Sequence, residues 1–269
     1  MSSGSAPGFP PEFLISGAEA LVRVKPVTLS PERAELAVES GPWLADPIVG
    51  FSRGALAVPL DDVTGYVVAA GSRRDRWPVS LGIRLDFLAD PPVDGSLLTV
   101  TGELLARDEQ GGATRGVISD ADGTVIGLVT QRSHLVQVDG PPTAPAITFD
   151  IPADDVPIRE ALGIRERARG VVDLPATAWA ANGMGSVHGG ILICASEFAA
   201  MSALDASGDL RSASIDIAFV RPGNAAEVTT FRADVIHRGR SLAVVRVAAE
   251  NSSGKACAVV TVIVQRVSS

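Results

Sequence analysis

The chain has 269 residues, of which 46% are hydrophobic and 20% charged, and its formal net charge is −8 at pH 7. This length accommodates one large domain or two ordinary ones, with enough apolar material for a buried core. The acidic balance argues against a surface for nucleic acid or membrane, which would need clustered Lys and Arg. The densest basic run, Arg73, Arg74 and Arg76, is interrupted by Asp75 and is interpreted as a solvated loop.

The N-terminal residues 1–17 are predicted to form a flexible tail, because they lack the positive start and apolar stretch of a signal peptide. No apolar run approaches the roughly 20 residues that span a bilayer. Cys194 and Cys257 both lie in apolar segments and are expected to be buried free thiols. We therefore expect a cytoplasmic protein.

In chain order, the first half begins with a strand-like stretch over residues 34–39. A small-residue apolar segment, 54–70, is long enough for a buried helix. The β-rich runs 79–88, 97–107 and 114–138 follow, and the last breaks at a hairpin signal over 120–123. Residues 139–165 are predicted to be a linker, rich in Pro and Ala at its start, with room for one short helix over 154–162.

The second half repeats this order. A strand-like stretch (170–174) precedes an apolar segment (189–204) and the β-rich runs 212–220, 228–238 and 241–267, with a turn at 251–254. Landmarks recur at a nearly constant offset: Gly54 and Gly190 are 136 residues apart, and Phe87 and Phe219 are 132 apart. Two copies fit a fused pair of domains, because a solenoid needs at least three repeats.

The repeat predicts an α+β fold with two tandem units, residues 18–138 and 166–269. Each unit would be a central helix covered by an antiparallel sheet. Pairing the two units edge to edge would protect the sheet edges, and the chain would then mimic a homodimer.

Residues 182–190, Asn-Gly-Met-Gly-Ser-Val-His-Gly-Gly, run directly into the second predicted helix. The glycines allow another group to approach the backbone closely. The first helical turn carries free N–H groups and the positive end of the helix dipole, so it would polarise a carbonyl and stabilise an oxyanion. A carboxylate could then activate water or attack the carbonyl itself, without a Ser or Cys nucleophile.

Structural interpretations of these residues remain open. His188 could be a satisfied structural histidine, Gly189 and Gly190 could serve packing, and Asp61 and Asp62 could be helix-surface charges. The three histidines and two cysteines show no metal-ligand spacing, so no metal is expected. A phosphate loop and a Gly-x-Ser-x-Gly elbow are both absent from the sequence.

The pattern Asn182-x5-His188-Gly189-Gly190, with Glu197 seven residues after the second glycine, resembles the PaaI-like branch of the hot-dog acyl-CoA thioesterases. Residues 214–223 and 236–242 also resemble that family's strand and loop pattern. The resemblance covers residues 165–268 well and residues 20–138 more loosely. It implies hydrolysis of an acyl-CoA to free acid and CoA, with CoA part of the substrate and no separate cofactor. It also implies that fused chains pair further into a homo-oligomer.

In that family one subunit supplies the Asn and the His-Gly-Gly helix start, and the other supplies an acid from its central helix. Aligning Gly54 with Gly190 sets Asp61 opposite Glu197, so the resemblance implies one intact site at the junction of the two units. Gly189 N–H would hold the oxyanion, and Asp61 would be general base or nucleophile, with Asp62 as its near competitor.

The remaining roles follow from the same resemblance. Asn182 would position the water or the acyl carbonyl, and His188 would orient the loop or bind the thioester. Further candidates for substrate binding are Gly190, Ser80, Arg238, Arg240 and Ser241.

A mirror site, marked by Glu197 and Ser214, is predicted to be degraded. Asp46, Ser52, Arg53 and Gly54 stand there in place of Asn182, His188, Gly189 and Gly190. Arg53 would hinder approach to the helix start, and Pro59 would kink the first helix or delay it. Two alternatives to hydrolysis remain: a non-catalytic acyl-CoA-binding module, and a hot-dog hydratase or dehydratase.

Overall fold

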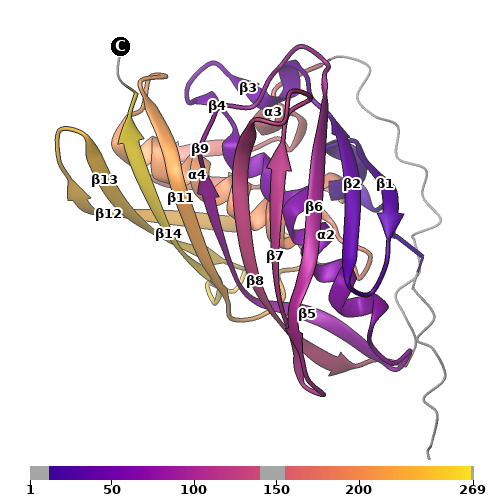
Figure 1. The fold of residues 1–269 in the computed structure, drawn as a ribbon. Helices are drawn as coiled ribbons and strands as arrows, with labels where there is room; N and C mark the ends of the chain where they lie inside the picture. Colours follow the sequence, from indigo (N-terminus) through magenta and orange to yellow (C-terminus); the bar gives the residue numbers. More distant parts are fainter. Residues whose placement is uncertain (1–11, 140–154, 268–269) are drawn as a thin grey trace, which may run out of the picture.

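The computed structural model describes residues 12–139 and 155–267, so most of the predicted tail and much of the predicted linker lie outside the described residues. The fold is α+β (Figure 1). One 12-stranded antiparallel sheet curves around two central helices, α2 (Ala57–Ala70) and α4 (Gly189–Leu204). The predicted class, a large antiparallel sheet with central helices, is therefore confirmed.

The two halves of the sheet have the same strand order. From its outer edge inward, the first half contains β1 (Val24–Leu29), β2 (Arg33–Glu39), β6 (Leu97–Arg107), β7 (Gly111–Ser119), β8 (Val125–Gln137) and β5 (Arg76–Phe87). The second half contains β9 (Arg165–Ala168), β10 (Val171–Leu174), β12 (Thr229–Arg238), β13 (Leu242–Glu250), β14 (Ala256–Arg266) and β11 (Leu210–Phe219). The halves meet where β5 pairs with β11 and Arg84 lies opposite Asp216.

The central helices are buried on nearly all sides. All of α4 except Gly189 and Ser202 is buried, which is the pattern of a helix covered by a sheet on one face and by another helix beside it. The first predicted helix begins with a 3₁₀ turn, η2 (Arg53–Leu56), and becomes α-helical only at Ala57. Pro59 lies in the first turn of α2, where its missing N–H removes no helical hydrogen bond.

Glycines bring the starts of the two helices together. A Cβ at Gly190 would lie 2.4 Å from the backbone N of Val58, and a Cβ at Gly54 would lie 3.0 Å from Cα of Cys194. The two contacts are related by the 136-residue repeat. The close approach places the first turn of α4 beside α2.

Short elements join the two halves. Helix α1 (Gly17–Leu21) packs against η3 (Ala178–Ala180), and the Ala18 N–H donates to the Ala181 carbonyl at 3.2 Å. Ser16 and Gly17, placed in the predicted tail, are buried here. Helix α3 (Ile158–Ala161) lies within the predicted linker, and a two-stranded ribbon joins β3 (Ala45–Asp46) to β4 (Gly50–Phe51).

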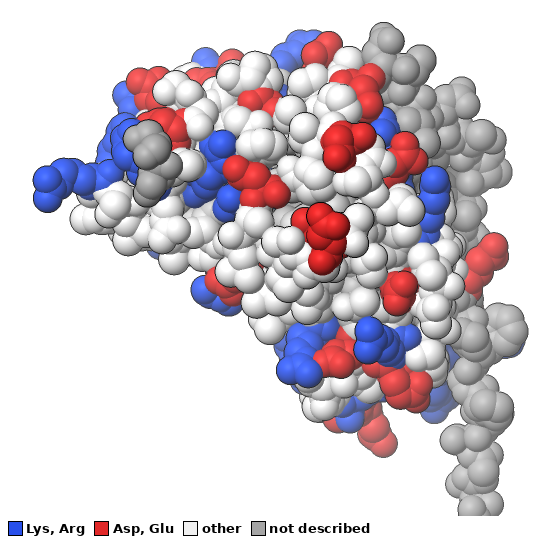
Figure 2. All heavy atoms as spheres, turned by 45° about the horizontal axis from the view of Figure 1, so that its top comes forward, with Lys and Arg blue, Asp and Glu red and all other residues white. Residues whose placement is uncertain are grey.

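The distribution of surface charges and the burial of the two cysteines agree with what the sequence predicts. On the face in Figure 2, blue and red residues are interspersed and form no continuous basic patch. Cys194 and Cys257 are buried free thiols, as expected. None of the helices in the described residues combines the length and apolarity that crossing a membrane requires.

Candidate active site

A cavity of about 630 Å³ lies between the two halves, at the N-terminal turn of α4. This site cavity is lined from the first half by α2, β5, β8, Glu19 and residues 12–14, and from the second half by residues 182–184, 186–189, 192 and 219–223. Its volume falls within the range of small-molecule sites.

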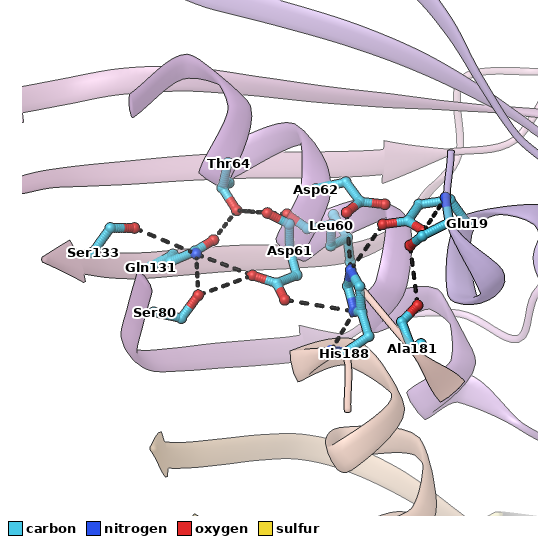
Figure 3. Close-up of polar contacts among 12 residues, drawn as sticks. Glu19, Leu60, Asp61, Asp62, Thr64, Ser80, Gln131, Ser133, Ala181 and His188 are labelled. Atoms are coloured by element: carbon cyan, nitrogen blue, oxygen red, sulfur yellow. Dashed lines mark hydrogen bonds and ion pairs between the residues drawn. The ribbon is translucent and has the colours of Figure 1, made fainter. Parts of the chain in front are cut away.

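Asp61 extends from α2 toward the start of α4, with its two carboxylate oxygens in different surroundings (Figure 3). Oδ1 accepts hydrogen bonds from Ser80 Oγ at 3.1 Å and from Gln131 Nε2 at 3.0 Å. Oδ2 faces the helix start, where a Cβ on Gly189 would lie 2.5 Å from it. A side chain at residue 189 would therefore displace this carboxylate or shift the helix start.

The pKa of Asp61 is raised. Burial is the largest cause, and the charge of His188 and the hydrogen bonds from Ser80 and Gln131 oppose it. The carboxyl is therefore more basic than an exposed aspartate, which suits a group that takes a proton from water.

Gly189 is the first residue of α4, and its N–H has no helical acceptor. Among the described residues, no hydrogen bond from this N–H is found. A backbone donor and a carboxylate oxygen from opposite halves thus lie side by side at the cavity. This is the pair of groups that attack on a carbonyl requires.

His188 caps α4 and does not project into the cavity as a free base. Its Nδ1 accepts the Gly190 N–H at 3.0 Å, and its Nε2 lies 3.0 Å from Asp62 Oδ1 and 3.5 Å from Glu19 Oε1. Burial lowers the pKa of His188, but the charges and hydrogen bonds of Asp62 and Glu19 outweigh it and raise the pKa well above its usual value. At Nδ1 the Gly190 N–H favours a ring without a proton on that atom, whereas the Asp61 Oδ2 atom, 3.7 Å away, favours the protonated ring.

Glu19, Asp62 and His188 form a buried acidic cluster. Burial and the charge of Glu19 raise the pKa of Asp62 to about 7. Burial would raise the pKa of Glu19 as well, but His188 and the Ser16 hydroxyl lower it. Asp62 Oδ2 is buried without a hydrogen-bond partner among the described residues.

These three residue types could also bind a metal ion, since their ligand atoms lie within 4.8 Å of one another. In the neutral ring, an Nδ1 that accepts an N–H leaves the proton on Nε2, the atom that points into the acidic cluster, and the raised pKa of His188 also favours a proton there. A metal at Nε2 would displace that proton and leave the ring as an imidazolate. The cluster is therefore better suited to sharing protons among its three side chains than to binding a metal ion.

Asn182 lines the cavity at the loop before α4. Its Oδ1 accepts from the N–H groups of Met184 at 2.9 Å and Ser186 at 3.0 Å, so it shapes the loop. Only the side-chain NH₂ of Asn182 remains for a substrate or water. Ser80, also at the cavity, holds Asp61.

The other proposed substrate-binding residues lie elsewhere. Gly190 packs against Val58 and gives its N–H to His188. Arg238, Arg240 and Ser241 lie at the β12–β13 hairpin, where the Ser241 carbonyl accepts from the Arg266 N–H beside the first residue of β11. The last residue of β11, Phe219, lines the cavity. At about 3.3 Å per residue, the hairpin is roughly 30 Å away along the strand.

Sequence reasoning did not identify Gln131 or Glu19. Gln131 is only 4% exposed, and its Nε2 binds Asp61 and also Ser80 Oγ at 2.7 Å. Its equivalent in the second half is Val262, by the matching registers of β5 with β8 and β11 with β14. A buried polar residue where the other copy carries valine was the signal that could have revealed it.

The mirror site is filled by its own side chains. Arg53, 8% exposed, binds Asp90 and donates to the Ser212 carbonyl at 2.9 Å. Glu197 Oε2 accepts the Gly54 N–H at 2.8 Å, so a carboxylate already occupies that helix start. Asp46, the counterpart of Asn182, binds Arg159 of α3 at 2.8 Å.

Ser212, not Ser214, is the counterpart of Ser80, because the strand register shifts at both Ser80 and Ser212. Ser214 instead pairs with Asp86 where the two halves meet.

Comparison with known proteins finds a family match in the second half of the chain. Residues 176–265 match the family described as the acyl-CoA thioesterase N-terminal domain. No curated protein matches the chain.

Several solved structures share the fold across nearly the whole chain. A candidate thioesterase from Novosphingobium aromaticivorans has a TM-score of 0.63 and 18% identity, covering 90% of this chain and 98% of that one. Acyl-CoA thioesterase II TesB2 from Mycobacterium marinum has a TM-score of 0.59 and 12% identity, covering 94% and 97%. An acyl-ACP thioesterase from Bacteroides thetaiotaomicron has a TM-score of 0.59 and 13% identity, covering 87% and 98%. At these identities the likeness shows a shared hot-dog fold.

Proposed function

We propose that this protein is an acyl-CoA thioesterase with one working site at the junction of two fused hot-dog units. The observation that carries the proposal is the position of Asp61 Oδ2, from one half, against Gly189 at the helix start of the other half. The matching strand order of the two halves supports a fused pseudo-dimer. The family match over residues 176–265 supports a thioester substrate.

In the proposed reaction the thioester carbonyl oxygen lies at the Gly189 N–H. Asp61 takes a proton from water, the water oxygen bonds to the carbonyl carbon, and the oxyanion is stabilised by the helix start. Collapse breaks the C–S bond, and the CoA sulfur recovers the proton from Asp61. In the nucleophilic variant, Asp61 Oδ2 bonds to the carbonyl carbon, and the C–S bond breaks to release CoA as a thiolate. Water then hydrolyses the mixed anhydride to the free acid, restores the Asp61 carboxylate and supplies the proton that the thiolate takes up.

Asp61 is preferred to Asp62 as the catalytic carboxylate. Asp62 Oδ1 is engaged by His188, while Asp61 Oδ2 faces the helix start at the cavity. His188 is assigned the capping of α4, since both of its ring nitrogens face protein groups. A hydratase needs a histidine free to act on the acyl chain, so this geometry favours hydrolysis.

Release of free thiol from a panel of acyl-CoAs tests the proposal. Asp61→Asn keeps the shape and removes the base, so we expect kcat to fall on the order of 10²–10⁴-fold. Asp62→Asn is the matched control in the next position, and we expect a smaller loss.

Undiminished turnover in Asp61→Asn would refute the assignment of Asp61 as general base or nucleophile. Acyl-CoA binding without thiol release by the wild-type protein would favour the binding module. Pairing of fused chains into a larger oligomer stays a prediction, to be measured by analytical ultracentrifugation.

A further inference from the structure

Gly65 occupies the middle of α2, one turn after Asp61, and lines the site cavity. Glycine inside a helix is less favourable than alanine, because it loses more conformational freedom on folding. Close packing does not require it here, because a Cβ at Gly65 would have only one neighbour within 4 Å, Gln131 Nε2 at 3.9 Å. The missing side chain therefore leaves space in the cavity itself.

The equivalent position in α4 carries a large side chain. Met201 follows Glu197 as Gly65 follows Asp61, and it is 1% exposed. In the second half of the chain, Met201 therefore fills the position that Gly65 leaves open in the first half.

The cavity continues along α2 beyond Gly65. Asp61, Gly65 and Ala69 are spaced four residues apart, share one helix face and all line the cavity. Eight residues at about 1.5 Å each make a wall about 12 Å long, the extended length of a chain of about nine carbons.

Apolar groups form the facing walls of this space. Trp77 and Val136 reach it from the paired ends of β5 and β8, and Phe13 packs against Tyr66 with ring centroids 5.9 Å apart. The polar pantetheine arm and the phosphates of CoA would lose hydration in such a space, whereas an alkyl chain gains from the transfer.

We propose that the acyl group of the substrate is a medium-length apolar chain, about eight to ten carbons, that runs along α2 past Gly65. Gly65 is thus a specificity-determining position. This inference rests on the proposed thioesterase function and adds the class of acyl group.

The test measures kcat/KM for thiol release from straight-chain acyl-CoAs of two to sixteen carbons. We expect the wild-type protein to peak at eight to ten carbons. Gly65→Met installs the residue of the mirror helix, and we expect it to lower the decanoyl-to-butyryl ratio of kcat/KM on the order of 10–100-fold. Gly65→Ala, a smaller filling, should shift the ratio in the same direction by less.

Met201→Ala is the matched control, since it changes the same turn of the other helix and should leave the order of chain lengths unchanged. A Gly65→Met variant that loses activity equally on all chains, or keeps the wild-type order, would overturn the inference. So would an equal shift in Met201→Ala.

Calorimetric binding of decanoyl-CoA to Asp61→Asn provides a readout without turnover. Adding Gly65→Met to that variant should weaken binding on the order of 10-fold or more, and unchanged binding counts against the channel. If no acyl-CoA is hydrolysed but binding still depends on Gly65, the proposed activity fails and the acyl channel stands.

Discussion

Asp61 is held by hydrogen bonds at one carboxylate oxygen, while the other lies 3.7 Å from His188 Nδ1 at the start of α4. Ser80 and Gln131 donate to Oδ1, so Oδ2 is aimed at Gly189 without a hydrogen bond of its own among the described residues. The two donors also lower the pKa of Asp61 against the effect of burial. The same contacts therefore fix both the direction and the charge of the proposed base.

Gln131→Leu tests this support. The reaction needs ionised Asp61, so activity falls as the pH drops through its pKa. Loss of the Gln131 donor should raise that pKa further, and the acidic limb of the kcat/KM profile should move to higher pH. Ser133→Ala is the control, because Ser133 contacts Gln131 at 3.4 Å and does not touch Asp61. An unshifted limb in Gln131→Leu would contradict the assignment.

Individual site residues were predictable only where a pattern marked them. The seven-residue spacing shared by Asp61 and Glu197 predicted that both acids lie on the central helices, and they lie on α2 and α4. Glu19 could not be found this way, because it lies in a five-residue helix with no periodic pattern and is brought to His188 by tertiary packing.

At the level of elements, the contact between the helix starts depends on Gly190. A Cβ there would lie 2.4 Å from the backbone N of Val58, and backbone cannot move aside as a flexible side chain can. Gly190→Ala should therefore destabilise the protein by about 1–3 kcal/mol in urea unfolding, as overpacking does.

Gly65→Ala is the matched control on α2. Its Cβ has open space, so the alanine should be neutral or stabilise the fold by up to about 1 kcal/mol. Equal stability of Gly190→Ala and the wild type would show that the helices can separate without cost.

Helices and central strands were predicted well because each buries an apolar face. The predicted apolar segment 189–204 coincides with α4, and 97–107 coincides with β6. The edge strands β1 and β9 were missed. Four of six residues in β1 and all four in β9 are exposed, so backbone pairing and not hydrophobic alternation defines them.

At the scale of the whole molecule, the two halves treat their central acids differently. Asp61 reaches the cavity, whereas Glu197 is fully buried and burial raises its pKa to about 7. The unfolded chain would release this proton near the ordinary value of 4.5. The folded state therefore binds the extra proton between these values, and stability falls as the pH rises through that window.

Glu197→Gln should remove this penalty while keeping an acceptor for the Gly54 N–H. We expect little change in unfolding free energy at pH 4.5 and stabilisation of up to about 3 kcal/mol at pH 8. Thiol release should persist, because Glu197 lies in the filled mirror site. A stability difference that does not vary with pH, or loss of turnover, would contradict this account.

The joining of β5 to β11 within one chain has a consequence for how such a protein can change over time. In a dimer of identical subunits, every substitution appears twice, so neither site can be sacrificed alone. Here Asp61 and Glu197, and likewise Gly65 and Met201, are separate positions open to separate selection. One half can keep an open cavity while the other half fills the equivalent space with side chains. Two identical subunits could not diverge in this way.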